Sequence, residues 1–169
     1  MANYNQRMNK QIYQVSDKLG KEKLEKDMGA FFGSILGSLN HILVGDLLWL
    51  SRFGGHSSDY VTLLKLNEYP KPQKLNDVLY SEFPELYKTR KEVDHLIQYW
   101  LKDETKEMHF EQNLTYSNSK GITSSRNFGE LVSHFFNHQT HHRGQVSTLL
   151  YQFGYDVGVT DFLIDIPSE

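Results

Sequence analysis

Four of the eight histidines in this chain of 169 residues lie in one stretch, HFFNHQTHHRGQ, which runs from His134 to Gln145. Each residue of a helix advances by about 100°, so His134, His138 and His142 share an arc with apolar neighbours, and His141 lies close to it. All four imidazoles are therefore expected to point inward, where each needs a partner. The pairs His134/His138, His138/His142 and His138/His141 could each chelate one ion. The spacing does not choose among these pairs, and it also fits hydrogen-bonded histidines without an ion.

His41 is a further candidate ligand, in the apolar stretch 31–50. It shares a helix face with Gly37 and Gly45, and such small neighbours leave room for an ion or a ligand. The alternative is a single histidine that faces solvent or a backbone carbonyl. Asp46 is a carboxylate near the centre of the main apolar stripe. It could orient a ligand histidine, act as a base or pair with a buried arginine, and we favour the pairing role.

The composition limits the chemistry that these residues can support. The chain has no cysteine, so it forms no disulfide or thiolate zinc site, and any metal must bind His, Asp or Glu. The net charge of −3 and the lack of a basic run disfavour nucleic-acid binding. The N-terminus lacks the apolar core of a signal peptide, and stretch 31–50 contains His41 and Asp46, which indicates a buried helix and no membrane span. We therefore expect a cytoplasmic protein.

Four segments with helical periodicity must position these side chains. They cover about residues 4–19, 30–52, 76–102 and 127–153. Pro84 falls early in the third segment, where it marks an irregular first turn or a later true start. The connection over residues 54–75 is long enough to cross the length of a bundle. Residues 109–126 alternate with a period of two around the turn Asn118-Ser119-Lys120-Gly121, which predicts a β-hairpin between the third and fourth helices.

The remaining segments carry weaker signals. Residues 21–27 are expected to form a charged turn, and the apolar tail over residues 159–166 is expected to pack back onto the helices. His56, His95 and His109 lie near predicted loops or on a polar face, so we expect them at the surface.

Two motifs resemble the DinB-like family. FFGSILGSLNHILVGDLLWLSRF, residues 31–53, is followed about a hundred residues later by NHQTHHRGQVSTLLYQFGYDVGVTD, residues 137–161. The resemblance covers nearly the whole chain and implies a single domain, 1–169, folded as an all-α four-helix bundle in up-down-down-up order. It also implies a divalent metal site formed by His41, His138 and His142.

The resemblance leaves the chemistry less defined. Some relatives are metal-dependent transferases or isomerases that use a low-molecular-weight thiol, and others resemble hydrolases. We expect an enzyme in which three imidazoles leave an ion, zinc first and nickel second, with open positions for water, an external thiol or a small-molecule substrate. The alternative is a non-catalytic metal-binding bundle for stress response. The resemblance and the aromatic content also suggest a homodimer. Candidates for supporting the ligands or facing the substrate are Asp46, His134, His141 and Gln145.

Overall fold

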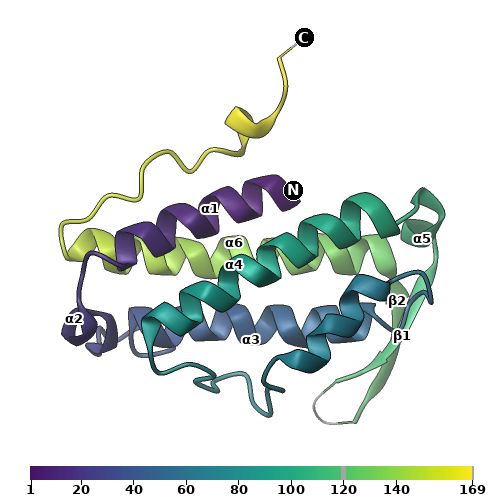
Figure 1. Cartoon of the computed structure of the whole chain (residues 1–169), viewed down its shortest axis with the longest axis horizontal. Coiled ribbons are helices and arrows are strands. Elements are labelled where there is room, and N and C mark those ends of the chain that lie inside the picture. The colour runs from purple at the N-terminus through teal and green to yellow at the C-terminus, as the bar shows by residue number, and fades with distance from the viewer. Residues whose placement is uncertain (119–120, 169) are drawn as a thin grey trace.

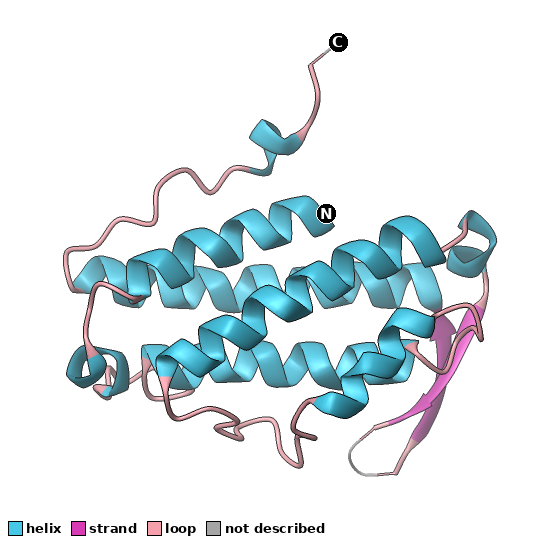
Figure 2. Cartoon of the chain, in the orientation of Figure 1, coloured by secondary structure: helices cyan, strands magenta, loops and turns pink. Residues whose placement is uncertain are grey.

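The computed structural model describes residues 1–118 and 121–168 and is predominantly helical (Figures 1 and 2). Four long helices run beside one another, and a two-stranded antiparallel sheet lies at one end. The elements are α1 (Ala2–Ser16), α2 (Lys21–Glu25), α3 (Ile35–Phe53), η1 (Val61–Glu68), α4 (Phe83–Tyr99), η2 (Trp100–Glu104), α5 (Glu107–Glu111), β1 (Asn113–Ser117), β2 (Thr123–Asn127), α6 (Phe128–Gln152) and η3 (Phe162–Asp165).

The two helices that carry the histidine motifs have defined ends. The side chain of Ser34 accepts a hydrogen bond from the Gly37 amide and caps α3. The Asn127 side chain accepts a bond of 2.9 Å from the Glu130 amide and caps α6 in the same way. Beyond α6, the backbone turns at Gly154, whose φ of 81° lies in the region that glycine favours. Helix α6 therefore begins and ends within one residue of the prediction, whereas α3 ends as predicted but begins at Ile35, about five residues later than expected.

The third predicted helix begins later than expected. Residues 76–82 are irregular and α4 starts at Phe83, with Pro84 in its first turn, where proline needs no intrahelical hydrogen bond. The expected charged turn contains the short helix α2, and the expected connection contains η1. The β-hairpin is confirmed with Asn113 opposite Asn127, although residues 107–111 before it form α5. Of its predicted turn, residues 119–120 lie outside the described residues.

The long helices enclose the core. Helix α3 packs on α6, and α1 packs on both α4 and α6. Large side chains that are almost fully buried fill the space between them, notably Phe53, Trp100, Phe128 and Phe135. Over the described residues, none of the helices combines the length and the apolar character needed to cross a membrane.

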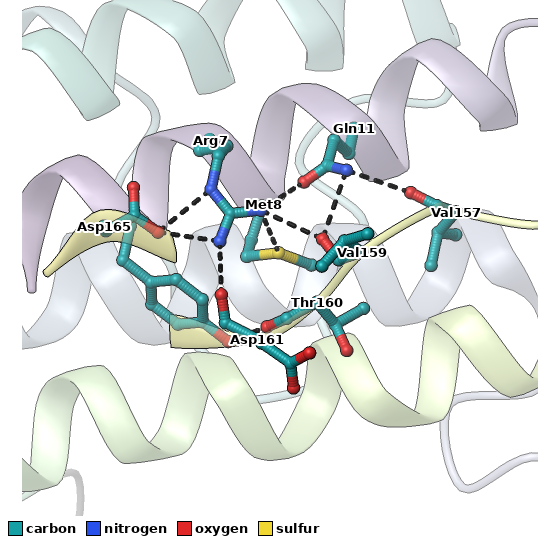
Figure 3. A network of polar contacts seen from close by, with 9 residues as sticks. Arg7, Met8, Gln11, Val157, Val159, Thr160, Asp161 and Asp165 are labelled. Carbon is teal, nitrogen blue, oxygen red and sulfur yellow. Dashed lines mark hydrogen bonds and ion pairs between the residues drawn. The ribbon is translucent and has the colours of Figure 1, made fainter. Parts of the chain in front are cut away.

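The C-terminal segment returns along α1, but it does so mainly through polar contacts (Figure 3). Arg7 donates to the Asp165 carboxylate at 2.7 Å and to the backbone oxygens of Val159 and Asp161 at 3.0 and 2.8 Å. The apolar side chain of Leu163 is 73% exposed. The predicted return of the tail is therefore seen, whereas burial of its apolar side chains is not.

Candidate metal centre

Three histidine side chains from two helices meet at one point. Nε2 of His41, on α3, lies 3.2 Å from Nε2 of His138 and 3.1 Å from Nε2 of His142, both on α6. One ring nitrogen from each residue lies within 4.8 Å of the other two, a spacing suited to holding one metal ion. His41 is buried, and the two histidines of α6 are partly exposed. The group is therefore accessible from one side.

Hydrogen bonds at the opposite ring nitrogens determine which atoms carry protons. Nδ1 of His41 lies 2.7 Å from the backbone oxygen of Leu75, and Nδ1 of His142 lies 2.8 Å from Oε1 of Gln145. An oxygen of a carbonyl or an amide only accepts, so each Nδ1 carries the hydrogen and each Nε2 keeps its lone pair. Histidines that bind metals are usually oriented in this way by a carbonyl or a carboxylate.

The surroundings keep these rings neutral. Burial, together with the charges of the neighbouring His142 and His41, lowers the pKa of His138 to about 3. Burial also lowers the pKa of His41 and of His142, although their hydrogen bonds to Leu75 and Gln145 work in the other direction. Because the rings are neutral and each Nδ1 carries the hydrogen, the Nε2 lone pairs of His41 and His142 face one another. A divalent cation relieves that repulsion and satisfies all three rings, so the donor set fits a metal ion.

Two glycines of α3 and the ring of Phe32 shape the space around the three histidines. A Cβ atom on Gly45 would lie 2.6 Å from Cε1 of His138, so this ring occupies the space that a side chain would fill. The ring of Phe32 stacks on His41, with centroids 3.7 Å apart, and covers the group on that side. At Gly37 a Cβ atom would lie 2.2 Å from the backbone oxygen of Phe32, so this glycine admits the covering turn. The small residues near His41 thus make room for His138 and Phe32.

The comparisons with known proteins agree with the sequence motifs. The sequence model of the DinB family matches residues 1–169. The chain belongs to the DinB family. It is 30% identical to the protein named Protein DinB of Bacillus subtilis (strain 168) over 161 residues, which cover 94% of this chain and 87% of that protein. No solved structure matches significantly.

Two histidines of this DinB-family chain lie outside the group, contrary to the expectation that all four point inward. His134 is exposed, and its ring lies 5.2 Å from that of Trp49. His141 is also exposed and accepts a bond of 3.2 Å from the side-chain amide of Gln145, which in turn accepts from His142. The angle around α6 does not separate these residues: His41 of α3 lies beside His138 and His142, whereas Trp49 of α3 lies beside His134.

Asp46 is buried and pairs with Arg90, which is the role that the sequence favours for it. Burial raises the pKa of Asp46 to about 6, although the charge of Arg90 opposes the rise. Arg90 also contacts Asp94 at 2.9 Å, without hydrogen-bond geometry at that guanidinium nitrogen. The carboxylate of Asp46 therefore joins α3 to α4 through Arg90, and no hydrogen bond links it to the three histidines.

His109, expected at the surface, is buried within α5. Its Nδ1 accepts a bond of 2.8 Å from the Tyr60 hydroxyl and one of 3.2 Å from the Lys106 amide. His56 stacks on Phe128, with ring centroids 4.0 Å apart. These contacts attach the region after α3 to α5 and α6. The surface expectation was wrong for His109, whose partner Tyr60 is distant in sequence, while His56 is partly exposed.

No local pattern indicated that the ring of Phe32 or the backbone oxygen of Leu75 would contact His41. A cavity of about 1290 Å³ lies elsewhere, between the start of α1, η2 and a face of α6 that includes Phe136 and Thr140. At about 100° per residue, that face is opposite His138. The cavity is therefore separate from the histidine group, and its size says nothing about the chemistry there.

Proposed function

We propose that the protein binds one divalent metal ion through Nε2 of His41, His138 and His142. The observation that carries this proposal is the convergence of three neutral imidazole nitrogens, two of them oriented by hydrogen bonds at the opposite ring nitrogen. Zinc is the first choice, because three imidazoles suit it and no thiolate is available, and nickel is the second.

We propose further that this ion supports catalysis on a small-molecule substrate. Among the described residues, the group that could hold an ion contains three ligands and no fourth, so positions remain for exchangeable groups. When bound, a divalent ion supplies Lewis acidity that can activate water or a low-molecular-weight thiol. The chain itself would orient the ligands through Leu75 and Gln145 and exclude water on the side covered by Phe32. A thiol transferase or a hydrolase fits this arrangement.

The alternative is a metal-binding protein without catalysis, acting in stress response. Such a protein would gain from a closed site with a fourth protein ligand. Asp46, His134 and His141 are the candidates for that ligand, yet Asp46 pairs with Arg90, and the other two histidines contact Trp49 and Gln145. The open ligand set therefore favours the enzyme.

We propose that the four long helices form an up-down-down-up bundle that makes one domain over residues 1–169, as the family resemblance implies. The long connection between α3 and α4 supports that order, since it allows consecutive helices to run in the same direction.

We propose further that the protein is a cytoplasmic homodimer without nucleic-acid or membrane partners. Sedimentation at micromolar concentration should give twice the monomer mass of 19.7 kDa, and a monomer mass would contradict the dimer.

The deciding experiment combines metal analysis with an activity screen. The purified chain should contain or take up one divalent ion per protomer, and the loaded protein should be tested against thiol-conjugation and hydrolysis substrates. His138→Ala is the inactive control, because His138 belongs to every ligand pair that the spacing allows. A chain that binds no divalent ion between about pH 6 and 8, where free imidazole loses its proton, would contradict the whole proposal.

A further inference from the structure

A second cluster of side chains adjoins the histidine group. The Arg52 cluster consists of Trp49, Arg52, Tyr116 and His134. The guanidinium carbon of Arg52 lies 4.6 Å from the ring centre of Trp49 and 5.3 Å from that of Tyr116. The rings of Trp49 and His134 are 5.2 Å apart, and His134 lies 6.3 Å from His138. The cluster therefore continues the line of the histidines toward the hairpin, which lies beside the C-terminal end of α3 (Figure 1).

The cluster carries a positive charge without a matching negative one. Over the described residues, no carboxylate forms an ion pair with Arg52, and no protein acceptor bonds to its guanidinium. By contrast, Arg7 and Arg90 are held by carboxylates. The indole N–H of Trp49 and the hydroxyl of Tyr116 likewise have no hydrogen-bond partner in the described part of the chain. Arg52, Trp49 and Tyr116 thus offer several donors and one positive charge, which is the complement of an anion.

The position of Arg52 favours an anion-binding role over an interaction with the carbonyl groups at the end of α3. Arginine in the last turn of a helix is commonly explained by favourable interaction with the terminal carbonyls. Here the guanidinium instead folds back over Trp49, one turn toward the N-terminus of α3. Partial burial against the aromatic rings also lowers the pKa of Arg52 from its ordinary value, which indicates incomplete hydration. A partly dehydrated guanidinium attracts an anion more strongly than a fully solvated one.

We propose that the Arg52 cluster binds the carboxylate or phosphate of a small-molecule substrate whose reactive end lies at the three histidines. The link to the histidines rests on the proposed function. Arg52 follows Gly45, which adjoins His138, by two helical turns, so the two ends are separated by roughly 10 Å along α3. Substrates with an anionic group at about that distance from the reacting atom should be selected over neutral ones.

Intrinsic fluorescence of the metal-free protein tests the anion site alone. Trp49 lies in the cluster, whereas Trp100, the other tryptophan, is fully buried. We expect octanoate or octyl phosphate to bind about tenfold more tightly than octanol. Arg52→Gln should remove this preference, and Arg126→Gln, on the exposed hairpin, should keep it. The tighter of the two anions identifies the group. Equal binding of octanol, or a preference that survives Arg52→Gln, would overturn the proposal.

The link to the histidines needs a second titration with the cobalt-loaded protein. 8-Mercaptooctanoate should bind about tenfold more tightly than 8-mercaptooctanol, as followed by thiolate-to-cobalt absorption, and Arg52→Gln should make the two equal. Equal binding to the unaltered protein would refute the shared substrate site even if octanoate binds at Arg52. If cobalt does not bind, the proposed function and the link fail together, while the fluorescence titration still decides the anion site. If cobalt binds without anion preference, only the present inference fails.

Discussion

Gly45→Ala is the smallest change that should separate metal binding from folding. Gly45 lies inside α3 and faces His138 on α6. Its added Cβ atom would lie 2.6 Å from Cε1 and 3.2 Å from Nδ1 of that ring. Because His138 is only partly buried, its side chain can turn away toward solvent while the backbone stays in place. The variant should therefore fold normally with a displaced ligand.

The expected magnitude follows from contact distances. Carbon atoms in favourable contact lie about 3.5–4.0 Å apart, so the ring must move by roughly 1 Å. Metal–ligand distances tolerate deviations of only about 0.2 Å, so the displaced Nε2 can no longer share an ion with His41 and His142. We expect the zinc affinity to fall at least about 100-fold, since even the loss of an outer supporting contact costs about 10- to 100-fold. The metal-free protein should gain stability of about 0.5–1 kcal/mol, because alanine favours a helix over glycine.

The assay is a zinc competition titration combined with urea unfolding in the presence of chelator. Gly144→Ala is the matched control, because this glycine also lies within a helix and its added Cβ atom would meet nothing within 4 Å. It should give a similar gain in stability with unchanged zinc affinity. If Gly45→Ala folds and keeps its zinc affinity within about threefold, then His138 does not bind zinc from its position against Gly45, and the ligand assignment is refuted.

Three further predictions concern the same group. His142→Ala should abolish stoichiometric metal binding, whereas His134→Ala should leave it nearly unchanged; metal analysis after gel filtration would show the reverse if the ligand pair were His134/His138. Gln145→Ala should lower metal affinity by about 10- to 100-fold without unfolding the chain, because His142 loses the acceptor that orients its ring. The metal-free protein should lose stability as the pH falls below about 6.5, because the lowered pKa of His138 lets the unfolded chain bind a proton that the folded chain does not. Urea unfolding from pH 7 to 5 checks this, and an equally steep decline in His138→Gln would contradict it.

Periodicity could predict the helices that carry the site, because their apolar faces and caps are local features. It could not choose among the histidine pairs. His134/His138 and His138/His142 have the same spacing, and the structure separates them only through the position of α3, where His41 lies beside His142 and Trp49 lies beside His134. That alignment joins residues about a hundred positions apart. The family resemblance therefore supplied information that spacing within α6 does not contain.

The features that local sequence does not reveal have a similar physical origin. The position of His109 near a predicted loop indicates a surface residue, yet its ring is buried and bonds to Tyr60, which comes 49 residues earlier. Phe32 lies just before α3 and reaches the site through a turn. Leu75 contributes only a backbone oxygen, which no pattern of side chains can reveal. Local patterns describe a single helix face well, but they do not show which distant segment covers it.

The core explains how α6 directs two of its histidines toward α3. Gln139 and Arg143 directly follow His138 and His142, and both are buried. Arg143 bonds to the side-chain oxygen of Asn5 on α1 and lies 3.1 Å from the Thr140 hydroxyl. Burial lowers the pKa of Arg143 to about 10, so it remains charged at neutral pH and keeps these acceptors. A rotation of α6 large enough to separate the ligands would pull this charge away from Asn5 on α1, which is costly in a buried setting. The polar contacts on one face of α6 thus fix the direction of the imidazoles on the neighbouring face.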